Sequence, residues 1–139
     1  MTHQIGLLDT SAVVRIGELD PEDLPDQVVI SAITLAELSV GPLVATDEQE
    51  RAARQARLQE VEANYGDPMP FDANAARAFA QVSVDYRRAG SKSKARAFDA
   101  LLAAMAKAAQ LPLYTFNPRD FADVTGIEVI PLPPDQPVG

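Results

Sequence analysis

Four short apolar runs occur along the chain, and the stretches between them have the spacing of helices. We predict strands at residues 5–8, 28–30, 113–115 and 128–130. Runs of this length, bounded by polar or turn-forming residues, are typical of strands buried on both faces. Strands that alternate with helices form parallel sheets, and right-handed crossovers place helices on both faces of such a sheet. The sequence therefore predicts an α/β domain with a mainly parallel central sheet flanked by helices.

Capping residues mark where the helices between these strands begin. The predicted helices are residues 12–19 with Thr10 and Ser11 as caps, a stretch from Ser31 to about Val40, one from a Thr46–Gln49 capping box to about Asn64, one capped by Asp72 that carries Tyr86, and residues 94–109 capped by Ser93. The chain has 139 residues and no repeat or linker, so we expect one domain over residues 1–139. The proline-rich end, from about residue 132, is expected to be a loose tail.

The composition excludes several classes of chemistry. The chain has no cysteine and a single histidine, His3. Disulfides, thiolate metal sites and cysteine nucleophiles are therefore excluded, and a histidine-rich zinc site is not expected. No apolar run approaches the roughly 20 residues that span a bilayer. We expect a soluble protein of the cytoplasm, without a membrane partner, whose chemistry comes from carboxylates, hydroxyls, amides, lysine and arginine.

The charge is acidic overall but contains one basic strip. The formal net charge is −8, which argues against binding nucleic acid through bulk charge. Between residues 87 and 96 there are five basic side chains and no acid, namely Arg87, Arg88, Lys92, Lys94 and Arg96. Two interpretations stay open: a local contact for phosphates, or a solvated loop and helix start.

Four acidic residues lie where their surroundings are otherwise apolar. Asp9 ends the first predicted strand, and Asp120 follows the third, so both lie at the sheet edge where parallel α/β folds bind ligands. Glu37 interrupts the apolar face of its helix. Asp99 lies within an Ala/Leu face, where a carboxylate is costly unless a cation or hydrogen bonds meet it.

Each of these acids also has a purely structural interpretation. Asp9 is a possible helix cap, although Thr10 and Ser11 already offer caps, and Asp120 is a possible turn cap. Asp99 could be a buried carboxylate paired with an arginine. If the four acids converge, however, they repel one another unless a divalent cation balances them. A site made only of oxygen ligands selects Mg²⁺ or Mn²⁺, and such ions serve phosphodiester hydrolysis by activating water.

Four segments, read in order, resemble a known family. LLDTSA, ITLAELSVG, RAFDALLAAMA and YTFNPRDF are similar to the PIN domain, and more closely to the VapC toxins of VapBC toxin–antitoxin pairs. The resemblance implies a compact α/β/α sandwich and an endoribonuclease that depends on Mg²⁺, for which Mn²⁺ can substitute. It also implies an RNA substrate, a small VapB-like antitoxin as partner, and a homodimer.

The resemblance also assigns roles to particular residues. It implies an acidic quartet of Asp9, Glu37, Asp99 and Asp120, with Asp9 and Asp99 as the main metal ligands. It implies supporting roles for Ser11, Thr115 and Asn117, and Asn117 is an alternative to Asp120 at the last position. Where many relatives have arginine this chain has Phe116, which removes a cation near the site. The basic strip would guide RNA toward the metal, receive acidic side chains of an antitoxin, or do both.

Other classes of protein fit the sequence less well. A phosphatase of the haloacid dehalogenase type needs a second Asp two residues after Asp9, and Ser11 occupies that place. A phospho-accepting receiver domain needs an acidic pair at the first strand and a lysine after a late strand, and neither is present. Two alternatives remain: a catalytically weak binding or pairing module of the same fold, and a PIN nuclease that acts on structured DNA.

Overall fold

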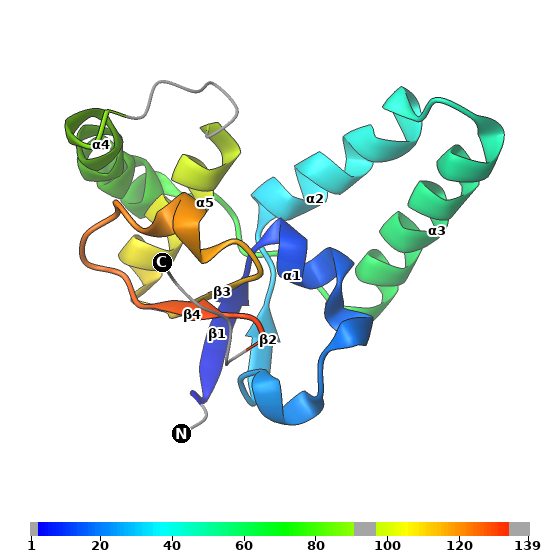
Figure 1. The fold of residues 1–139 in the computed structure, drawn as a ribbon, viewed down its shortest axis with the longest axis horizontal. Helices are drawn as coiled ribbons and strands as arrows, with labels where there is room; N and C mark the ends of the chain where they lie inside the picture. Colours follow the sequence, from blue (N-terminus) through cyan, green and yellow to red (C-terminus); the bar gives the residue numbers. More distant parts are fainter. Residues whose placement is uncertain (1–2, 91–96, 134–139) are drawn as a thin grey trace.

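The computed structural model describes residues 3–90 and 97–133, and its centre is a sheet of four parallel strands (Figure 1). The strands are β1 (Ile5–Leu8), β2 (Gln27–Val29), β3 (Leu113–Thr115) and β4 (Val129–Pro131). Their order across the sheet is β2-β1-β3-β4, and every neighbouring pair is parallel. This confirms the predicted sheet, although β2 begins one residue earlier, and β4 one residue later, than the sequence indicated.

Five α-helices and several 3₁₀ turns connect the strands within the described residues. The helices are α1 (Thr10–Val14), α2 (Ala32–Val40), α3 (Glu48–Asn64), α4 (Ala73–Arg88) and α5 (Ala97–Ala109). The 3₁₀ turns used below are η1 (Ile16–Glu18), η3 (Gly41–Val44) and η5 (Pro118–Phe121). In Figure 1, α4 and α5 lie on one side of the sheet, α1 lies on the other, and α2 and α3 form an arm that extends away from it.

The core consists of two layers because successive side chains of a strand point to opposite faces. Leu7 and Leu113 pack with residues of α4 and α5, whereas Leu8 and Tyr114 pack with residues of α1, α2 and α3. Leu7, Leu8 and Leu113 are fully buried. Helices on both faces explain why the strand sequences are continuously apolar. The observed α/β/α sandwich confirms the predicted fold class.

Helix α1 begins earlier than the sequence indicated because Asp9 is its cap. The backbone N–H of Ala12 donates to Oδ1 of Asp9 over 2.9 Å, which satisfies one of the free donors at the start of the helix. The prediction that Thr10 and Ser11 cap this helix is therefore wrong. The helix is also shorter than predicted, because it ends at Val14 and the chain continues into η1.

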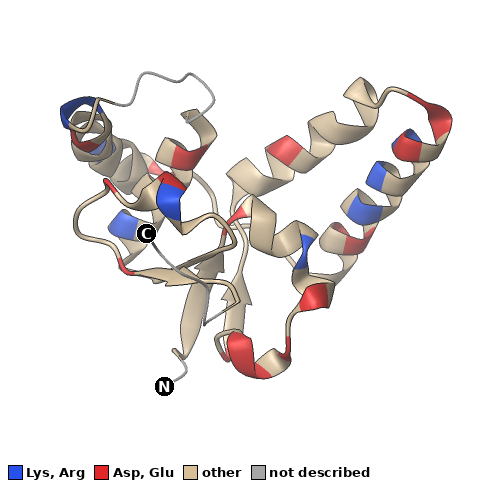
Figure 2. Ribbon diagram, viewed as in Figure 1, with Lys and Arg blue, Asp and Glu red and all other residues tan. Residues whose placement is uncertain are grey.

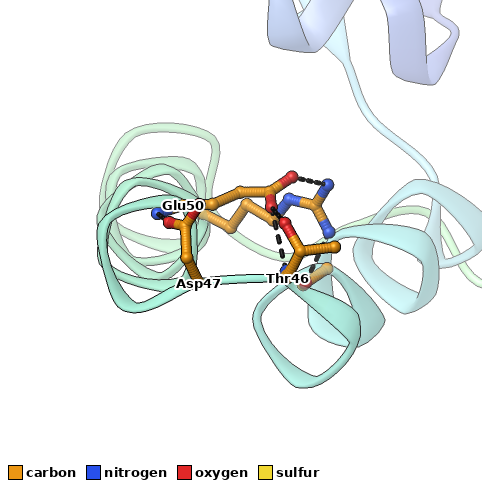
Figure 3. A network of polar contacts seen from close by, with 5 residues as sticks. Thr46, Asp47 and Glu50 are labelled. Carbon is orange, nitrogen blue, oxygen red and sulfur yellow. Dashed lines mark hydrogen bonds and ion pairs between the residues drawn. The ribbon is translucent and has the colours of Figure 1, made fainter.

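The arm formed by α2 and α3 is closed by a polar network at the start of α3 (Figure 3). Asp47 is the cap, since the N–H of Glu50 donates to its Oδ1 over 2.7 Å. The Glu50 carboxylate accepts from both the N–H and the hydroxyl of Thr46 and pairs with Arg54. Arg54 also donates to the Gly41 carbonyl in η3, so the two helices are joined at this end. The predicted capping box of Thr46 and Gln49 is thus wrong by one residue.

Leu132, at the start of the predicted tail, packs into the core. Leu132 is fully buried, and its backbone N–H donates to the carbonyl of Thr115 over 2.8 Å. Leu132 is thus buried within the predicted tail, and residues 134–139 lie outside the described residues. Ser93, the predicted cap of the last long helix, also lies outside them. Among the helices of the described residues, none combines the length and the hydropathy that crossing a membrane requires.

Candidate active site

The carboxylate of Asp9 lies at the carboxyl end of β1 and is surrounded by hydrogen-bond donors. Its Oδ1 accepts from the Ser11 hydroxyl over 2.7 Å as well as from the Ala12 N–H. Its Oδ2 accepts from the Thr115 hydroxyl over 2.5 Å, and Thr115 ends β3, the strand beside β1. Only 4% of the Asp9 surface is exposed. The carboxylate is thus held by groups from two adjacent strands.

Backbone amides fix the direction in which the two hydroxyl groups point. The Ser11 Oγ accepts from the N–H of Phe116 over 3.1 Å, and the Thr115 Oγ1 accepts from the N–H of Asn117 over 2.9 Å. Because each hydroxyl oxygen already faces an N–H, its own proton is directed to Asp9. Oδ1 then accepts two hydrogen bonds and Oδ2 one, so an acceptor position remains on Oδ2.

Glu37 lies in the middle of α2 and is oriented by a threonine of α1. Its Oε1 accepts from the Thr10 hydroxyl over 2.6 Å. The Thr10 oxygen is also 3.0 Å from the hydroxyl oxygen of Thr34, which is fully buried. Since the Thr10 proton goes to Glu37, Thr34 must be the donor to Thr10. These hydroxyls form a directed chain that ends on the Glu37 carboxylate.

Burial and neighbouring charges act on both carboxylates in the same direction. Burial raises the pKa of Asp9, hydrogen bonds from Thr115, Ser11 and Ala12 oppose the rise, and the charge of Asp120 adds to it. Burial also raises the pKa of Glu37, where the Thr10 hydrogen bond opposes the rise and the charge of Asp9 adds to it. Asp9 therefore lies within the electrostatic reach of both Asp120 and Glu37.

Asp99 and Asp120 are on elements that surround the end of β1. Asp120 is half-buried in η5, and Asp99 is half-buried in the first turn of α5. Helix α5 packs against both α2 and η5. In Figure 2, acidic positions of α2, α5 and η5 lie on the side of the sheet where β1 ends. The structure thus brings the elements of all four predicted acids to one edge of the sheet.

The chemistry of this donor set fits a hard divalent cation. Within residues 3–90 and 97–133, no three carboxylates gather closely enough to hold a metal ion between them. Mg²⁺, however, is commonly held by one or two carboxylates and several waters. Asp9 supplies an oriented carboxylate oxygen. The charge of Asp120 raises the pKa of Asp9, and the charge of Asp9 raises the pKa of Glu37. A bound cation would balance this mutual repulsion.

Asn117 and Phe116, which were also singled out from the sequence, lie next to Thr115 at the end of β3. Asn117 interacts through its backbone, and Phe116 interacts through its ring. Asn117 is exposed, and it is its backbone N–H that supports Thr115. Phe116 is 6% exposed, and the guanidinium carbon of Arg15 lies 3.9 Å from its ring centroid. A cation is therefore present beside Phe116, although it comes from the end of α1. Arg15 also forms an ion pair with Glu18.

The predicted basic strip is described only in part. Arg87 and Arg88 are exposed in the last turn of α4, where basic side chains suit the helix dipole. Lys92, Lys94 and Arg96 lie outside the described residues. The sequence reasoning did not identify Thr10 and Thr34 as part of the site. Both are hydroxyl residues at helix starts, where capping is the ordinary interpretation, so only the fold reveals their contact with Glu37.

Comparison with known proteins adds independent findings. Residues 6–127 match the PIN domain. The chain is 36% identical to Ribonuclease VapC5 of Mycobacterium tuberculosis over 135 residues, which is 93% of this chain and 96% of that protein. It is 35% identical to Ribonuclease VapC8 of M. tuberculosis over 104 residues, covering 74% of this chain and 91% of that protein. The structure is similar to a crystal structure of VapBC-5, a member of the VapBC family of toxin–antitoxin systems from M. tuberculosis. The TM-score is 0.77 and the identity 36%, over 93% of this chain and 99% of that chain.

Proposed function

The chain belongs to the PIN-domain family, and on that basis we propose that it is an endoribonuclease of the VapC type that hydrolyses RNA phosphodiester bonds. The relatives named as ribonucleases support this proposal at 36% and 35% identity. The observation that carries the proposal is the environment of the Asp9 carboxylate. This buried carboxylate is oriented by Ser11 and Thr115, and it shares its surroundings with the charges of Asp120 and Glu37.

We assign Mg²⁺, or Mn²⁺ in its place, to Asp9 and Asp99 as main ligands, with Glu37 and Asp120 completing the site. When bound, such an ion lowers the pKa of a water molecule and balances negative charge on a phosphate. The residues of the chain itself do the orienting: Ser11 and Thr115 hold Asp9, and Thr10 directs Glu37. Asn117 supports Thr115 through its backbone and is the alternative to Asp120 at the last position.

We further propose that a VapB-like antitoxin holds this activity in check and that the chain acts as a homodimer in the cytoplasm. The similarity to a VapBC toxin–antitoxin complex over 93% of this chain supports the antitoxin as partner.

Single-stranded loops of RNA are the substrates that such a site accepts most readily, since their bases and backbone are not enclosed in a helix.

A cleavage assay with matched variants tests the proposal. The purified chain is stripped of metal, supplied with Mg²⁺ or Mn²⁺, and given transfer RNA, ribosomal RNA and messenger RNA fragments. We expect internal cuts that a chelator abolishes and that Asp9→Asn removes. The control is Asp67→Asn, which changes an exposed acid outside the site. Metal-dependent cleavage by Asp9→Asn equal to that of the parent would contradict the assignment.

A second candidate is a binding or pairing module that keeps the fold without activity. The observation in its favour is that no three carboxylates of the described residues lie close enough together to hold a metal ion between them. Calorimetry with Mn²⁺ separates the two proposals. If the parent binds Mn²⁺ and Asp9→Asn does not, the result supports the nuclease. If the parent does not bind Mn²⁺ and does not cleave RNA, the result supports the binding module.

A further inference from the structure

The last turns of α4 are bonded to the segment that carries Asp120. The phenol hydroxyl of Tyr86 donates to the backbone carbonyl of Asp120 over 2.6 Å. Tyr86 is 6% exposed, and its ring packs in the core layer that contains Phe121, the residue after Asp120. The bond is partly buried and joins two parts of the chain 34 residues apart.

The neighbouring residue, Asp85, holds the same segment at a second point. Its Oδ2 accepts from both the N–H and the hydroxyl of Thr125, each over 2.9 Å, and its Oδ1 accepts from the Gln81 side chain over 3.0 Å. Asp85 is 6% exposed. The hydrogen bond from the Thr125 backbone, ahead of the other contacts, lowers the pKa of Asp85, so the carboxylate is charged and accepts all three bonds.

Helix α5 completes this arrangement from the other side. The Lys107 ammonium donates to the Thr125 carbonyl over 3.1 Å, and its charge also stabilises the Asp85 carboxylate. Gly126, which follows Thr125, has a φ of +79° and lies against the Lys107 side chain. The segment from Asp120 to Gly126 is thus hydrogen-bonded to α4 at Asp120 and at Thr125, and to α5 at Thr125.

We infer that Tyr86 and Asp85 are positioning residues for Asp120, and that they set where its carboxylate stands relative to Asp9. This inference rests on the proposed function and deepens it, because it assigns a role to two residues of α4 that hold the backbone of the Asp120–Thr125 segment. Groups that orient metal ligands from behind commonly change metal affinity or activity by roughly 10- to 100-fold when they are removed.

The test compares Tyr86→Phe and Asp85→Asn with matched controls at sites away from the segment. Tyr65→Phe removes a phenol hydroxyl at the end of α3, and Asp67→Asn neutralises an exposed acid. Each variant is examined for Mn²⁺ affinity by calorimetry, for kcat and KM in RNA cleavage, and for thermal unfolding. Hydrogen exchange of the Asp120 and Thr125 amides reports the local order of the segment without any metal.

For Tyr86→Phe we expect Mn²⁺ affinity and kcat to fall about tenfold, KM for RNA to stay the same, and the Asp120 amide to exchange faster. Excess Mn²⁺ should restore the cleavage rate, and thermal unfolding without metal shows whether the variant has also lost stability. Unchanged Mn²⁺ affinity and kcat in a folded Tyr86→Phe variant would overturn the inference while leaving the proposed function intact. A parent chain that neither binds Mn²⁺ nor cuts RNA would instead overturn the proposed function, and this inference with it.

Discussion

The Thr10 hydroxyl donates to Glu37 over 2.6 Å and so ties the first turn of α1 to the middle of α2. The bond lies next to Asp9, the cap of α1, whose charge raises the pKa of Glu37. Because Thr34 occupies the other side of the Thr10 oxygen, the Thr10 proton has one favourable direction. The two carboxylates are therefore oriented by consecutive hydroxyl residues, Thr10 for Glu37 and Ser11 for Asp9.

Replacing Thr10 by valine is expected to lower RNA cleavage roughly 10- to 100-fold, because Glu37 loses the donor that orients it. Thr10→Ser keeps the hydroxyl and should retain most of the activity. The measurement is the cleavage rate at saturating Mg²⁺ together with thermal unfolding of both variants. Equal loss of activity in Thr10→Ser and Thr10→Val would contradict an orienting role for the hydroxyl.

Replacing Asp9 by asparagine is expected to abolish cleavage while the chain stays folded. Asparagine is as good a helix cap as aspartate, so the start of α1 is preserved. The substitution also removes a buried charge and its repulsion with Asp120 and Glu37. Urea unfolding near neutral pH without divalent ions should give a free energy of unfolding equal to or above that of the parent. A large loss of stability would show that the charge supports the fold.

The raised pKa values of Asp9 and Glu37 predict how stability depends on pH. A carboxyl with a higher pKa in the folded chain stabilises it fully below the pKa of the unfolded chain, and this contribution is lost as the pH rises through the folded pKa. For Asp9 the window therefore begins near its ordinary value of 3.8 and extends upward. Unfolding curves from about pH 4 to pH 8 should show Asp9→Asn gaining on the parent as the pH rises.

Asp85 provides the opposite control for this pH series, because its folded pKa is lowered. Its contribution to stability is present above the pKa of the unfolded chain and is lost as the pH falls through the folded value. Asp85→Asn should therefore be most destabilised near neutral pH and approach the parent in acid. Parallel pH curves for the parent, Asp9→Asn and Asp85→Asn would refute both assignments.

The basic strip is expected to contribute to RNA affinity through phosphate contacts. Changing Arg87, Arg88, Lys92 and Lys94 together to alanine should weaken RNA binding and flatten its dependence on salt. The slope of log affinity against log salt should fall by about 0.7 for each phosphate contact that is lost. Arg51→Ala, at an ion-paired position of α3, serves as control. An unchanged slope would assign the strip to another role, such as contact with an antitoxin.

Gly6 in β1 leaves room for the Tyr114 ring and the Pro25 side chain to pack against the strand. A Cβ atom at this position would lie 2.5 Å from Cε1 of Tyr114 and 2.9 Å from Cγ of Pro25. Gly6→Ala is therefore expected to lower the free energy of unfolding by about 1–3 kcal/mol. The same change in a Tyr114→Leu background should have a smaller effect, which a double-mutant cycle measures. Equal effects in both backgrounds would mean that the Tyr114 ring is not the obstacle.

Much of the fold was predictable from the sequence because burial leaves a strong local pattern. The strands at Leu7 and Leu113 are apolar on both faces, and Ser31 and Asp72 are caps at the predicted positions. The errors at the helix starts fall where two neighbouring residues compete to cap one helix. At α1 the choice between Asp9 and the hydroxyls after it depends on contacts with β3 and α2, which local sequence does not contain.

The site was predictable to the level of which elements meet, and less so in its contacts. Asp9 and Asp120 follow strands, so the parallel topology alone brings them to one edge. The roles of Thr10, Thr34 and Tyr86 depend on contacts between segments 24 to 34 residues apart. A threonine near a helix start and a tyrosine on an apolar helix face have ordinary structural explanations, and no local pattern distinguishes them from residues that orient a carboxylate.

The double role of Asp9, as helix cap and as oriented carboxylate, bears on how this protein can be silenced. Asparagine can cap the helix but lacks the charge. A single substitution of Asp9 by asparagine is therefore expected to preserve the fold and abolish RNA cleavage. A cell harmed by RNA cleavage could lose that activity through this single substitution, without truncation of the protein. The resulting protein would keep its surfaces intact and still compete for whatever partner binds them.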